Sequence, residues 1–289
     1  MRLNPQPTPD TNAWRIHHDA DAGVWIDHFD GRWLVQTRSG RFPDGVEALA
    51  DGIATSIYWR PRDLDAATEP THRWGEVITE PFQVEENGAR FEIDFSAGYS
   101  PGIFLDQREN RLLVREKSRS GTKVLNAFAY TGAFSVMAAL GGAETSTLDL
   151  SKTYLDWTWR NFALNRLNRE DHHGCKGDAF EWLATFARQG REFDGVILDP
   201  PTFSRHKKKT FKTDRDYASL AELAAKLTKP GGWMLCCANT HKLYPGEYQR
   251  QVEEGIRAAG RNVLNLKKKP MPTEFNGDDY LKSLWVDVG

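Results

Sequence analysis

The second half of this chain alternates short apolar runs with amphipathic helical stretches, and this alternation limits the fold more than any other feature. Short apolar runs between turn signals are typical of buried strands. Strands that alternate with helices form a mostly parallel sheet covered on both faces. The sequence therefore predicts an α/β fold with a mostly parallel, seven-stranded sheet. The expected strands are 123–126, 145–148, 173–176, 195–198, 233–237, 262–266 and 284–288, and the expected helices are 151–167, 179–189, 217–227 and 247–259.

The first part of the chain has a different pattern. Residues 1–13 are polar and rich in proline, and we expect them to form a tail. Within 14–95, two apolar segments flank the turn signal Asp30-Gly31, which predicts a hairpin, and further short strands and one helix are expected. We therefore expect a small N-terminal α/β domain at 14–95 and the sheet domain at 96–289. The length of 289 residues suits two domains.

Composition limits the possible locations and partners. The formal net charge is −2, so any binding of nucleic acid is expected to be local rather than general. Three cysteines without metal-ligand spacing predict reduced thiols, a cytoplasmic location and no metal site. The N-terminal residues lack the apolar run of a signal peptide or a spanning helix, so no membrane association is expected. We expect a monomer or a homodimer.

The strand expected at 195–198 ends in Asp199-Pro200-Pro201, an unusual sequence for a strand end. Two prolines remove two backbone donors, and each restricts the residue before it to extended conformations. Asp199 is therefore expected on a rigid corner whose backbone carbonyls accept hydrogen bonds from a planar donor such as a nucleobase edge. The alternative is a simple strand end with an N-capping aspartate.

Three successive strands each deliver a carboxylate to the same edge: Asp149 follows the second, Asp178 the third and Asp199 the fourth. Ligands bind at the carboxyl ends of parallel strands. Asp149 is suited to hold both hydroxyls of a ribose, and Asp178 to accept from an adenine amino group, although helix capping explains either residue taken alone. After the first strand, residues 126–133 open a helix but carry one glycine, so the dinucleotide fingerprint is absent. The set predicts a nucleoside-carrying cofactor without phosphates.

In order and spacing, these motifs resemble the class I S-adenosylmethionine-dependent methyltransferases that modify bacterial large-subunit ribosomal RNA. The resemblance covers residue 14 to the end and implies a Rossmann-like methyltransferase domain, S-adenosylmethionine as cofactor, and a small linker domain before it. The motifs that carry it are 102–108, 126–135, 149–151, Gly177-Asp178 and 199–201.

The resemblance also implies cofactor-binding roles for individual residues. Arginine is matched chemically to a carboxylate, which suits Arg108, although a surface helix start is the alternative there. The implied residues are Arg108 at the cofactor carboxylate, Asn126, then Tyr130, Thr131 and Gly132 around the methionine part, Asp149 with Leu150 at the ribose, Asp178 and Ala179 at adenine, and Asp199.

Two branches of this family differ after the fifth strand. In the branch that forms 5-methylcytosine, a cysteine there attacks the ring, because carbon-5 is otherwise a poor nucleophile. Counted from Gly231-Gly232, that position holds Asn239, whereas Cys236 and Cys237 lie inside an apolar strand, where buried, inert thiols are expected. Asn239 instead resembles the branch typified by the C-terminal half of the bacterial fusion enzyme that forms 7-methylguanine.

We therefore expect methylation of a ring nitrogen of a nucleobase in RNA, with guanine N7 favoured. N7 carries a lone pair and no proton, so alignment is the main requirement. We assign Asp199 and the Pro200 carbonyl to positioning the base, Asn239 to orienting the target edge, and Phe203 to stacking, with core packing as the alternative for Phe203. Phosphate contacts are expected from Arg205, Lys207, Lys208, Lys209, Lys267 and Lys268, with solvated loop charge as the alternative.

Three other functions are compatible with the sequence. One is a 5-methylcytosine enzyme that uses Cys236 or Cys237, and another is a methyltransferase for a protein or a small molecule. The third is a binding module that retains the cofactor without turnover. No additional N-terminal RNA-binding domain is expected, which leaves the RNA substrate open.

Overall fold

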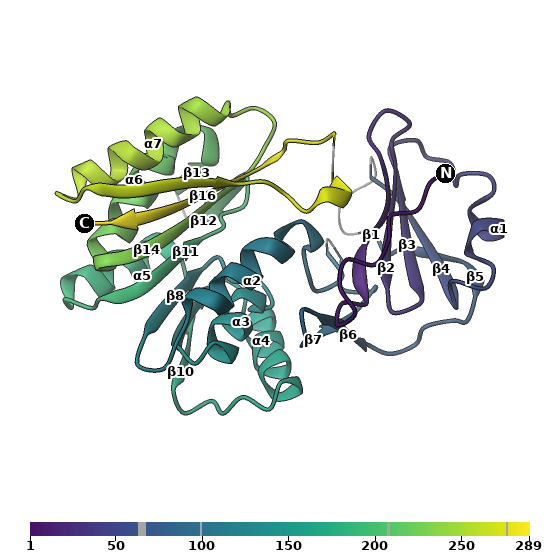
Figure 1. The fold of residues 1–289 in the computed structure, drawn as a ribbon, viewed down its shortest axis with the longest axis horizontal. Helices are drawn as coiled ribbons and strands as arrows, with labels where there is room; N and C mark the ends of the chain where they lie inside the picture. The colour runs from purple at the N-terminus through teal and green to yellow at the C-terminus, as the bar shows by residue number, and fades with distance from the viewer. Residues whose placement is uncertain (63–67, 99, 207–208, 276) are drawn as a thin grey trace. The chain divides into compact units, whose positions relative to one another are not determined.

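The computed structural model describes residues 1–62, 68–98, 100–206, 209–275 and 277–289, with the backbone only for 203–206, 209–212 and 214. Its described residues form two compact units, which are discontinuous in sequence (Figure 1). The first unit comprises 1–108 and 272–278, and the second comprises 109–271 and 279–289.

The first unit contains a five-stranded sheet with the order β1-β2-β3-β4-β5. Its strands pair antiparallel except for β3 and β4, which are parallel. The turn at Asp30-Gly31 joins β2 to β3, which confirms the predicted hairpin. The elements are β1 (Ala13–Asp19), β2 (Val24–Phe29), β3 (Arg32–Thr37), α1 (Val46–Ala50), β4 (Ser56–Pro61), β5 (Thr71–Gly75), the hairpin β6 (Phe82–Glu86) and β7 (Ala89–Ile93), and the short helices η1 (Leu105–Gln107) and η2 (Thr273–Phe275).

The segment before β1 is held against the sheet and is not a tail. The backbone N–H of Asn4 donates to the carbonyl of Ile16 at 2.7 Å, and the indole N–H of Trp14 donates to the carbonyl of Asn4 at 3.2 Å. Polar backbone groups of this segment therefore find partners that its composition does not reveal. The unit also extends past residue 95 to Arg108 and takes in η2 from near the C-terminus.

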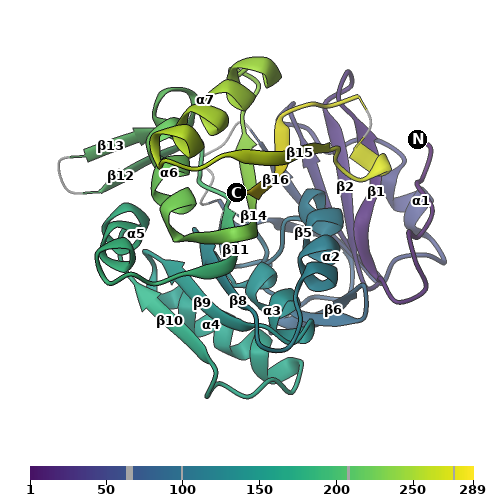
Figure 2. The ribbon, with the colours of Figure 1, turned by 60° about the vertical axis from the view of Figure 1, so that its left-hand side comes forward.

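The second unit is built on a seven-stranded sheet with the order β10-β9-β8-β11-β14-β16-β15 (Figures 1 and 2). The first five of these strands run parallel, and β16 is antiparallel to both of its neighbours. The mostly parallel seven-stranded sheet predicted from the sequence is thus confirmed. The strands are β8 (Lys123–Ala127), β9 (Glu144–Asp149), β10 (His172–Lys176), β11 (Phe193–Leu198), β14 (Thr228–Asn239), β15 (Val263–Lys269) and β16 (Leu281–Val288).

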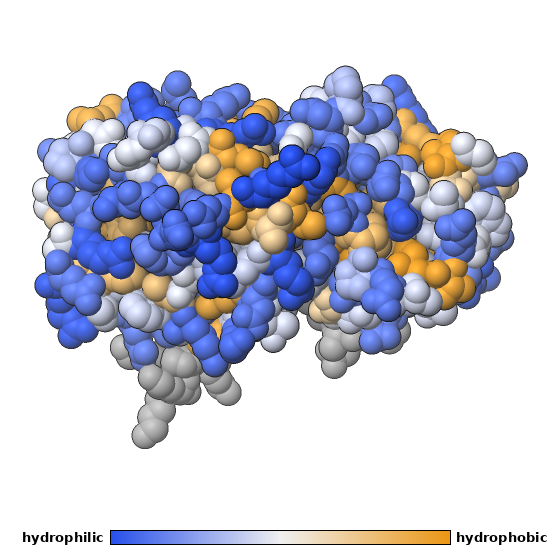
Figure 3. Space-filling model, turned by 90° about the horizontal axis from the view of Figure 1, so that it is seen from below, coloured by the Kyte–Doolittle hydropathy of each residue, from blue (hydrophilic) through white to orange (hydrophobic). Residues whose placement is uncertain are grey.

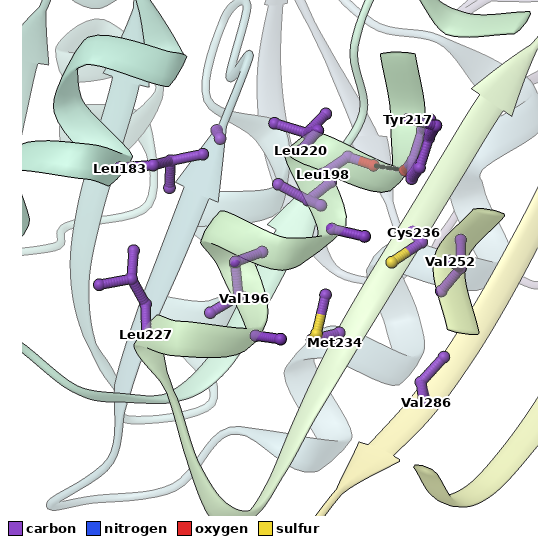
Figure 4. Packing of buried hydrophobic residues seen from close by; sticks show 14 of the residues in the cluster. Leu183, Val196, Leu198, Tyr217, Leu220, Leu227, Met234, Cys236, Val252 and Val286 are labelled. Atoms are coloured by element: carbon purple, nitrogen blue, oxygen red, sulfur yellow. Dashed lines mark hydrogen bonds between the residues drawn. The ribbon is translucent and has the colours of Figure 1, made fainter. Parts of the chain in front are cut away.

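Helices cover both faces of this sheet, because its central strands are apolar on both sides. Along β11, Val196 and Leu198 pack into one core cluster, whereas Ile197 packs into the cluster on the opposite face. Figure 4 shows part of the first cluster, where strand and helix side chains interdigitate. One layer contains α2 (Arg108–Lys117), α3 (Ala133–Leu140) and α4 (Lys152–Leu164), and the other contains α5 (Ala179–Arg188), α6 (Thr213–Leu227) and α7 (Pro245–Ala258).

The basic segment after the Asp-Pro-Pro corner contains a hairpin, which the sequence did not predict. Strands β12 (Phe203–His206) and β13 (Lys209–Lys212) pair as a separate two-stranded sheet (Figure 2). Helix α6 follows β13 directly and begins at Thr213, earlier than the predicted start at Tyr217. The sequence predicted neither the hairpin nor the early start of α6, because the residues of this segment are mostly polar.

No helix among the described residues is both long and apolar enough to cross a bilayer. Hydrophilic residues also cover most of the face drawn in Figure 3.

Candidate functional site

The loop between β8 and α3 has a constrained backbone. Phe128 and Tyr130 adopt positive φ angles of 61° and 50°, which are uncommon for residues with side chains. Gly132 follows at φ 75°, and a Cβ atom there would lie 2.4 Å from Cγ2 of Thr158 on α4. Only glycine therefore fits this close approach. Backbone outliers that are held by their surroundings are typical of ligand-binding sites.

Asp149, at the end of β9, holds the backbone on both sides of the carboxyl edge of the sheet. Its carboxylate accepts hydrogen bonds from the backbone N–H groups of Tyr130 and Ser151, both at 2.8 Å. Burial raises the pKa of Asp149, and hydrogen bonds from the backbone of Ser151, Tyr130 and Leu150 oppose that rise. The cap of α4 is Ser151, which accepts from the N–H of Tyr154. Asp149 is thus not the helix cap that was its alternative assignment.

The loop also packs against aromatic side chains of α4. The ring of Tyr130 contacts those of Tyr154 and Trp157, with centroid distances of 4.6 and 6.3 Å. Burial and the nearby charge of Asp149 raise the pKa of Tyr154. The side chain of Thr131 is fully buried, and its carbonyl accepts from Nδ2 of Asn161 at 2.9 Å. Its backbone and that of Gly132 are therefore the parts suited to meet a ligand.

Asn126, at the carboxyl-terminal part of β8, is almost completely buried. Its Nδ2 donates to Oγ of Ser135 at 2.9 Å, and Oγ1 of Thr147 donates to the same hydroxyl at 2.8 Å. Its Oδ1 has no hydrogen-bond partner among the described residues. An acceptor buried in this way is costly unless a ligand or water satisfies it.

Asp178 performs the capping role that was its alternative assignment, because its side chain accepts from the N–H of Glu181 at 3.1 Å as the N-cap of α5. Ala179 follows and is buried. The adjacent Gly177 donates its N–H to the carbonyl of Asp149 at 2.9 Å, which ties the ends of β9 and β10 together. Leu150, in contrast, leaves 49% of its surface exposed beside Asp149.

The Asp-Pro-Pro corner lies at the end of β11, which pairs with β8 on one side and β14 on the other. Asp199 is half-buried and Pro200 is buried. The hydroxyl of Thr202 donates to the carbonyl of Asn239, the last residue of β14. This bond joins the Asp-Pro-Pro corner to the end of β14, the two elements that are predicted to act on the substrate. Asp149, the β8–α3 loop, Asp199 and Asn239 occupy the ends of four adjacent parallel strands.

The thiols near this edge are unsuited to nucleophilic attack. Cys236 and Cys237 are both fully buried within β14, as the sequence predicted. Burial raises the pKa of Cys236 to about 12. Sγ of Cys237 lies 3.8 Å from the hydroxyl of Ser283. Because the thiolate is the reactive form, Cys236 is inert at neutral pH.

Arg108 has a partner that the sequence did not suggest. Its guanidinium group donates to both carboxylate oxygens of Glu274 in η2, one of them at 3.2 Å, and both side chains are buried. The two residues belong to the first unit. The role of Arg108 at the cofactor carboxylate stays a prediction.

The predicted phosphate-binding residues fall into two groups. Phe203, Arg205 and Lys209 are in the β12–β13 hairpin, whereas Lys207 and Lys208 lie outside the described residues. Lys267 and Lys268 are exposed on β15. They belong to the strand itself and do not follow it as predicted. Both Lys269 of β15 and Cys237 of β14 pair with Ser283, so the lysines approach the same edge as the carboxyl end of β14.

Sequence reasoning missed the residues that support the edge. Tyr154 and Trp157 pack on the loop, and Thr202, Thr213 and Tyr217 hydrogen-bond around the corner. The i, i+4 spacing of Thr213 and Tyr217 was a usable signal, but the predicted helix began too late to include Thr213.

Known proteins resemble this chain over most of its length. A family model described as S-adenosylmethionine-dependent methyltransferase matches residues 51–284. Ribosomal RNA large subunit methyltransferase K of Neisseria meningitidis serogroup B is 43% identical over 283 residues, which cover 91% of this chain and 77% of that protein.

A second relative shows the same similarity within a longer protein. Ribosomal RNA large subunit methyltransferase K/L of Shewanella loihica is 37% identical over 204 residues, which cover 70% of this chain but only 27% of that protein. Among solved structures, SMU.776 in complex with SAH superposes with a TM-score of 0.85 at 28% identity, covering 97% of this chain and 76% of that one.

Proposed function

Because this chain belongs to the family of S-adenosylmethionine-dependent methyltransferases, we propose that it methylates a ring nitrogen of a nucleobase in large-subunit ribosomal RNA, with guanine N7 as the favoured atom. The relatives that suggest this substrate are named as ribosomal RNA large subunit methyltransferases. The reaction takes place in the cytoplasm, where reduced thiols such as those of this chain are stable.

S-adenosylmethionine is the cofactor, and the residues at the strand ends fit it. Asp149 holds the ribose hydroxyls, and the exposed side chain of Leu150 covers the nucleoside. Asp178 and Ala179 contact adenine, while Asn126 and the backbone of Tyr130, Thr131 and Gly132 surround the methionine part, as the family resemblance implies. The cofactor supplies a methyl group on a positively charged sulfur.

One observation favours a ring nitrogen over carbon-5 of cytosine as the methylated atom. The strand ends next to the cofactor residues present Asp199, Pro200 and Asn239, while the two nearest thiols are buried inside β14. A 5-methylcytosine enzyme needs a reactive thiolate at this place, because carbon-5 must be activated by a covalent bond. Guanine N7 needs no such activation, since its lone pair is already available.

The protein's contribution is then orientation. The carboxylate of Asp199 and the carbonyl of Pro200 accept from the donor groups of the base, and the amide of Asn239 fixes its edge. Rigid placement of this kind is worth about 7–11 kcal/mol at its most favourable limit. The corner suits the task, because two consecutive prolines restrict its backbone.

Phosphate contacts position the RNA. Lys267 and Lys268 are exposed on β15 and approach the same edge of the sheet. The β12–β13 hairpin, with Arg205 and Lys209, begins directly after the corner, and Lys207 and Lys208 belong to the same basic segment; Phe203 is proposed to stack on a base. Such contacts hold the strand without reading its sequence.

The test uses purified protein, protein-free large-subunit ribosomal RNA and methyl-labelled S-adenosylmethionine. We expect the label in 7-methylguanosine after digestion. Asp199→Ala should chiefly lower the turnover number, with a smaller effect on cofactor affinity measured by calorimetry. Asp194→Asn is the matched control, because Asp194 lies at the opposite end of β11, where it pairs with Lys229 at 2.9 Å. Label in 5-methylcytidine, or no label in RNA, would contradict the proposal.

A further inference from the structure

The first turns of α6 carry two hydroxyl groups that reach the Asp-Pro-Pro corner. Oγ1 of Thr213 donates to the carbonyl of Pro201 at 3.0 Å, and its backbone N–H donates to the carbonyl of Thr202 at 3.2 Å. The hydroxyl of Tyr217 donates to the carbonyl of Leu198 at 3.4 Å, the bond drawn in Figure 4. Residues four apart lie on one face of a helix, so both side chains point toward the corner.

The two carbonyls that accept these hydrogen bonds, those of Leu198 and Pro201, flank Asp199 and Pro200. The ladder of β11 ends at Leu198, which pairs with Ala127 of β8 and Cys236 of β14. Beyond that point neither proline has an N–H to donate, so no regular ladder can hold the chain. Instead, the hydroxyls of Thr213 and Tyr217 bond the chain on either side of Asp199 and Pro200.

Both hydroxyl groups belong to side chains that are shielded from water. Thr213 and Tyr217 are fully buried. The ring of Tyr217 packs edge-to-face on that of Tyr248, with a centroid distance of 4.9 Å. Burial raises the pKa of Tyr217 well above its ordinary value, so the phenol keeps its proton and remains a donor throughout the usual pH range. Leu198 is fully buried, so its carbonyl loses a partner away from water when the Tyr217 donor is removed, whereas Pro201 is exposed.

We infer that Thr213 and Tyr217 are positioning residues for methyl transfer, which hold the Asp199-Pro200 corner at the angle that the target base requires. The inference rests on the proposed role of this corner. The two hydroxyls act through Leu198 and Pro201 and do not touch the substrate themselves.

The decisive variant is Thr213→Val, which keeps the shape of the side chain and removes its hydroxyl. We expect the turnover number on large-subunit ribosomal RNA to fall about 10-fold or more, because a displacement of roughly 1 Å can cost about 100-fold. The KM for RNA and the Kd for S-adenosylmethionine should change less than twofold. Thr213→Ser restores the hydroxyl and should recover at least half of the wild-type turnover.

Thr228→Val provides a matched control. Thr228 is also buried, and its Oγ1 donates to the carbonyl of Ala224 at 2.9 Å. It lies at the far end of α6, where β14 begins, away from the carboxyl edge of the sheet. This variant should lose as much thermal stability as Thr213→Val but keep the wild-type turnover number.

Tyr217→Phe tests the second hydroxyl. Its bond is longer, so we expect a fall in turnover of about 2- to 10-fold, the range of one neutral hydrogen bond. Equal turnover in the wild type and in both variants, or an equal loss in Thr228→Val, would overturn the inference.

Crystal structures separate a failure of this inference from a failure of the proposed function. In Thr213→Val, the Pro201 carbonyl should turn away from α6 while β11 stays in place. If the wild type transfers no methyl group to ribosomal RNA, the proposed substrate is wrong, but this structural comparison still decides the inference. A corner with unchanged backbone in both Thr213→Val and Tyr217→Phe would refute it whatever the substrate is.

Discussion

The backbone N–H of Tyr130 donates to the carboxylate of Asp149 across 2.8 Å, and this bond joins the loop after β8 to the end of β9. Because the same carboxylate also accepts from the N–H of Ser151, it organises the backbone on both sides of the proposed ribose site. One side chain therefore orders this loop and is also the group proposed to hold the ribose.

Asp149→Ala should weaken cofactor binding. The variant removes the charged acceptor proposed for the ribose hydroxyls, and one hydrogen bond to a charged group is worth about 1.5–3 kcal/mol. We expect the Kd for S-adenosylmethionine to rise about 10- to 100-fold, as measured by isothermal titration calorimetry. Glu144→Gln is the control, since Glu144 begins the same strand at the opposite edge and pairs with Lys123 at its surface. Equal affinities for wild type and Asp149→Ala would refute the ribose assignment.

Cofactor affinity should also depend on pH through Asp149. Burial raises the pKa of this carboxyl, so it takes up a proton at a higher pH than an ordinary aspartate does. The ionised form is the one that accepts two hydroxyls, and affinity is therefore lost as the pH falls through the raised pKa. Titration calorimetry between pH 8 and pH 5 should show the Kd rising toward acid in the wild type. A wild-type profile as flat as that of Asp149→Asn would contradict this assignment.

The double variant Cys236→Ala/Cys237→Ala should retain methyl transfer. Neither thiol is exposed, and the pKa of Cys236 near 12 keeps it protonated at assay pH. Truncation inside β14 is expected to cost about 1 kcal/mol of stability per site, seen as a lower Tm, while initial rates stay within twofold. Loss of methyl transfer by a variant that is still folded at the assay temperature would favour the 5-methylcytosine mechanism.

The buried pair of Arg108 and Glu274 permits a separate test. Arg108→Met leaves the Glu274 carboxylate without this cation and should cost about 3–5 kcal/mol in the free energy of unfolding, followed by tryptophan fluorescence in urea. Adding Glu274→Met should recover most of that loss. If Arg108 also meets the cofactor carboxylate, the stable double variant will still bind S-adenosylmethionine about 10-fold more weakly. Wild-type affinity in that double variant would restrict Arg108 to a structural role.

The centre of the parallel sheet was predictable because strands such as β11 and β14 are buried on both faces and so read as apolar runs. Exposed or polar strands gave no such signal: β5 (Thr71–Gly75) is half exposed, and the β12–β13 hairpin is rich in lysine. The late predicted start of α6 has the same origin, since the residues before Tyr217 are polar.

Within the site, the sequence predicted where a residue stands on its strand better than it predicted where its side chain points. Asp149 and Asp199 stand at the predicted strand ends, and the burial of Cys236 and Cys237 follows from their apolar strand. The sequence could not show that Asp178 turns its carboxylate to the N–H of Glu181, nor that Arg108 meets Glu274 from a distant part of the chain. Such pairs depend on tertiary structure, and local sequence periodicity carries no information about tertiary contacts.

The most direct test of the central claim is nucleoside mass spectrometry of large-subunit ribosomal RNA from cells with and without the gene. We expect one 7-methylguanosine to disappear with the gene and to return when the wild-type protein, but not Asp199→Ala, is supplied. An unchanged 7-methylguanosine content, or the loss of a 5-methylcytidine in its place, would contradict it.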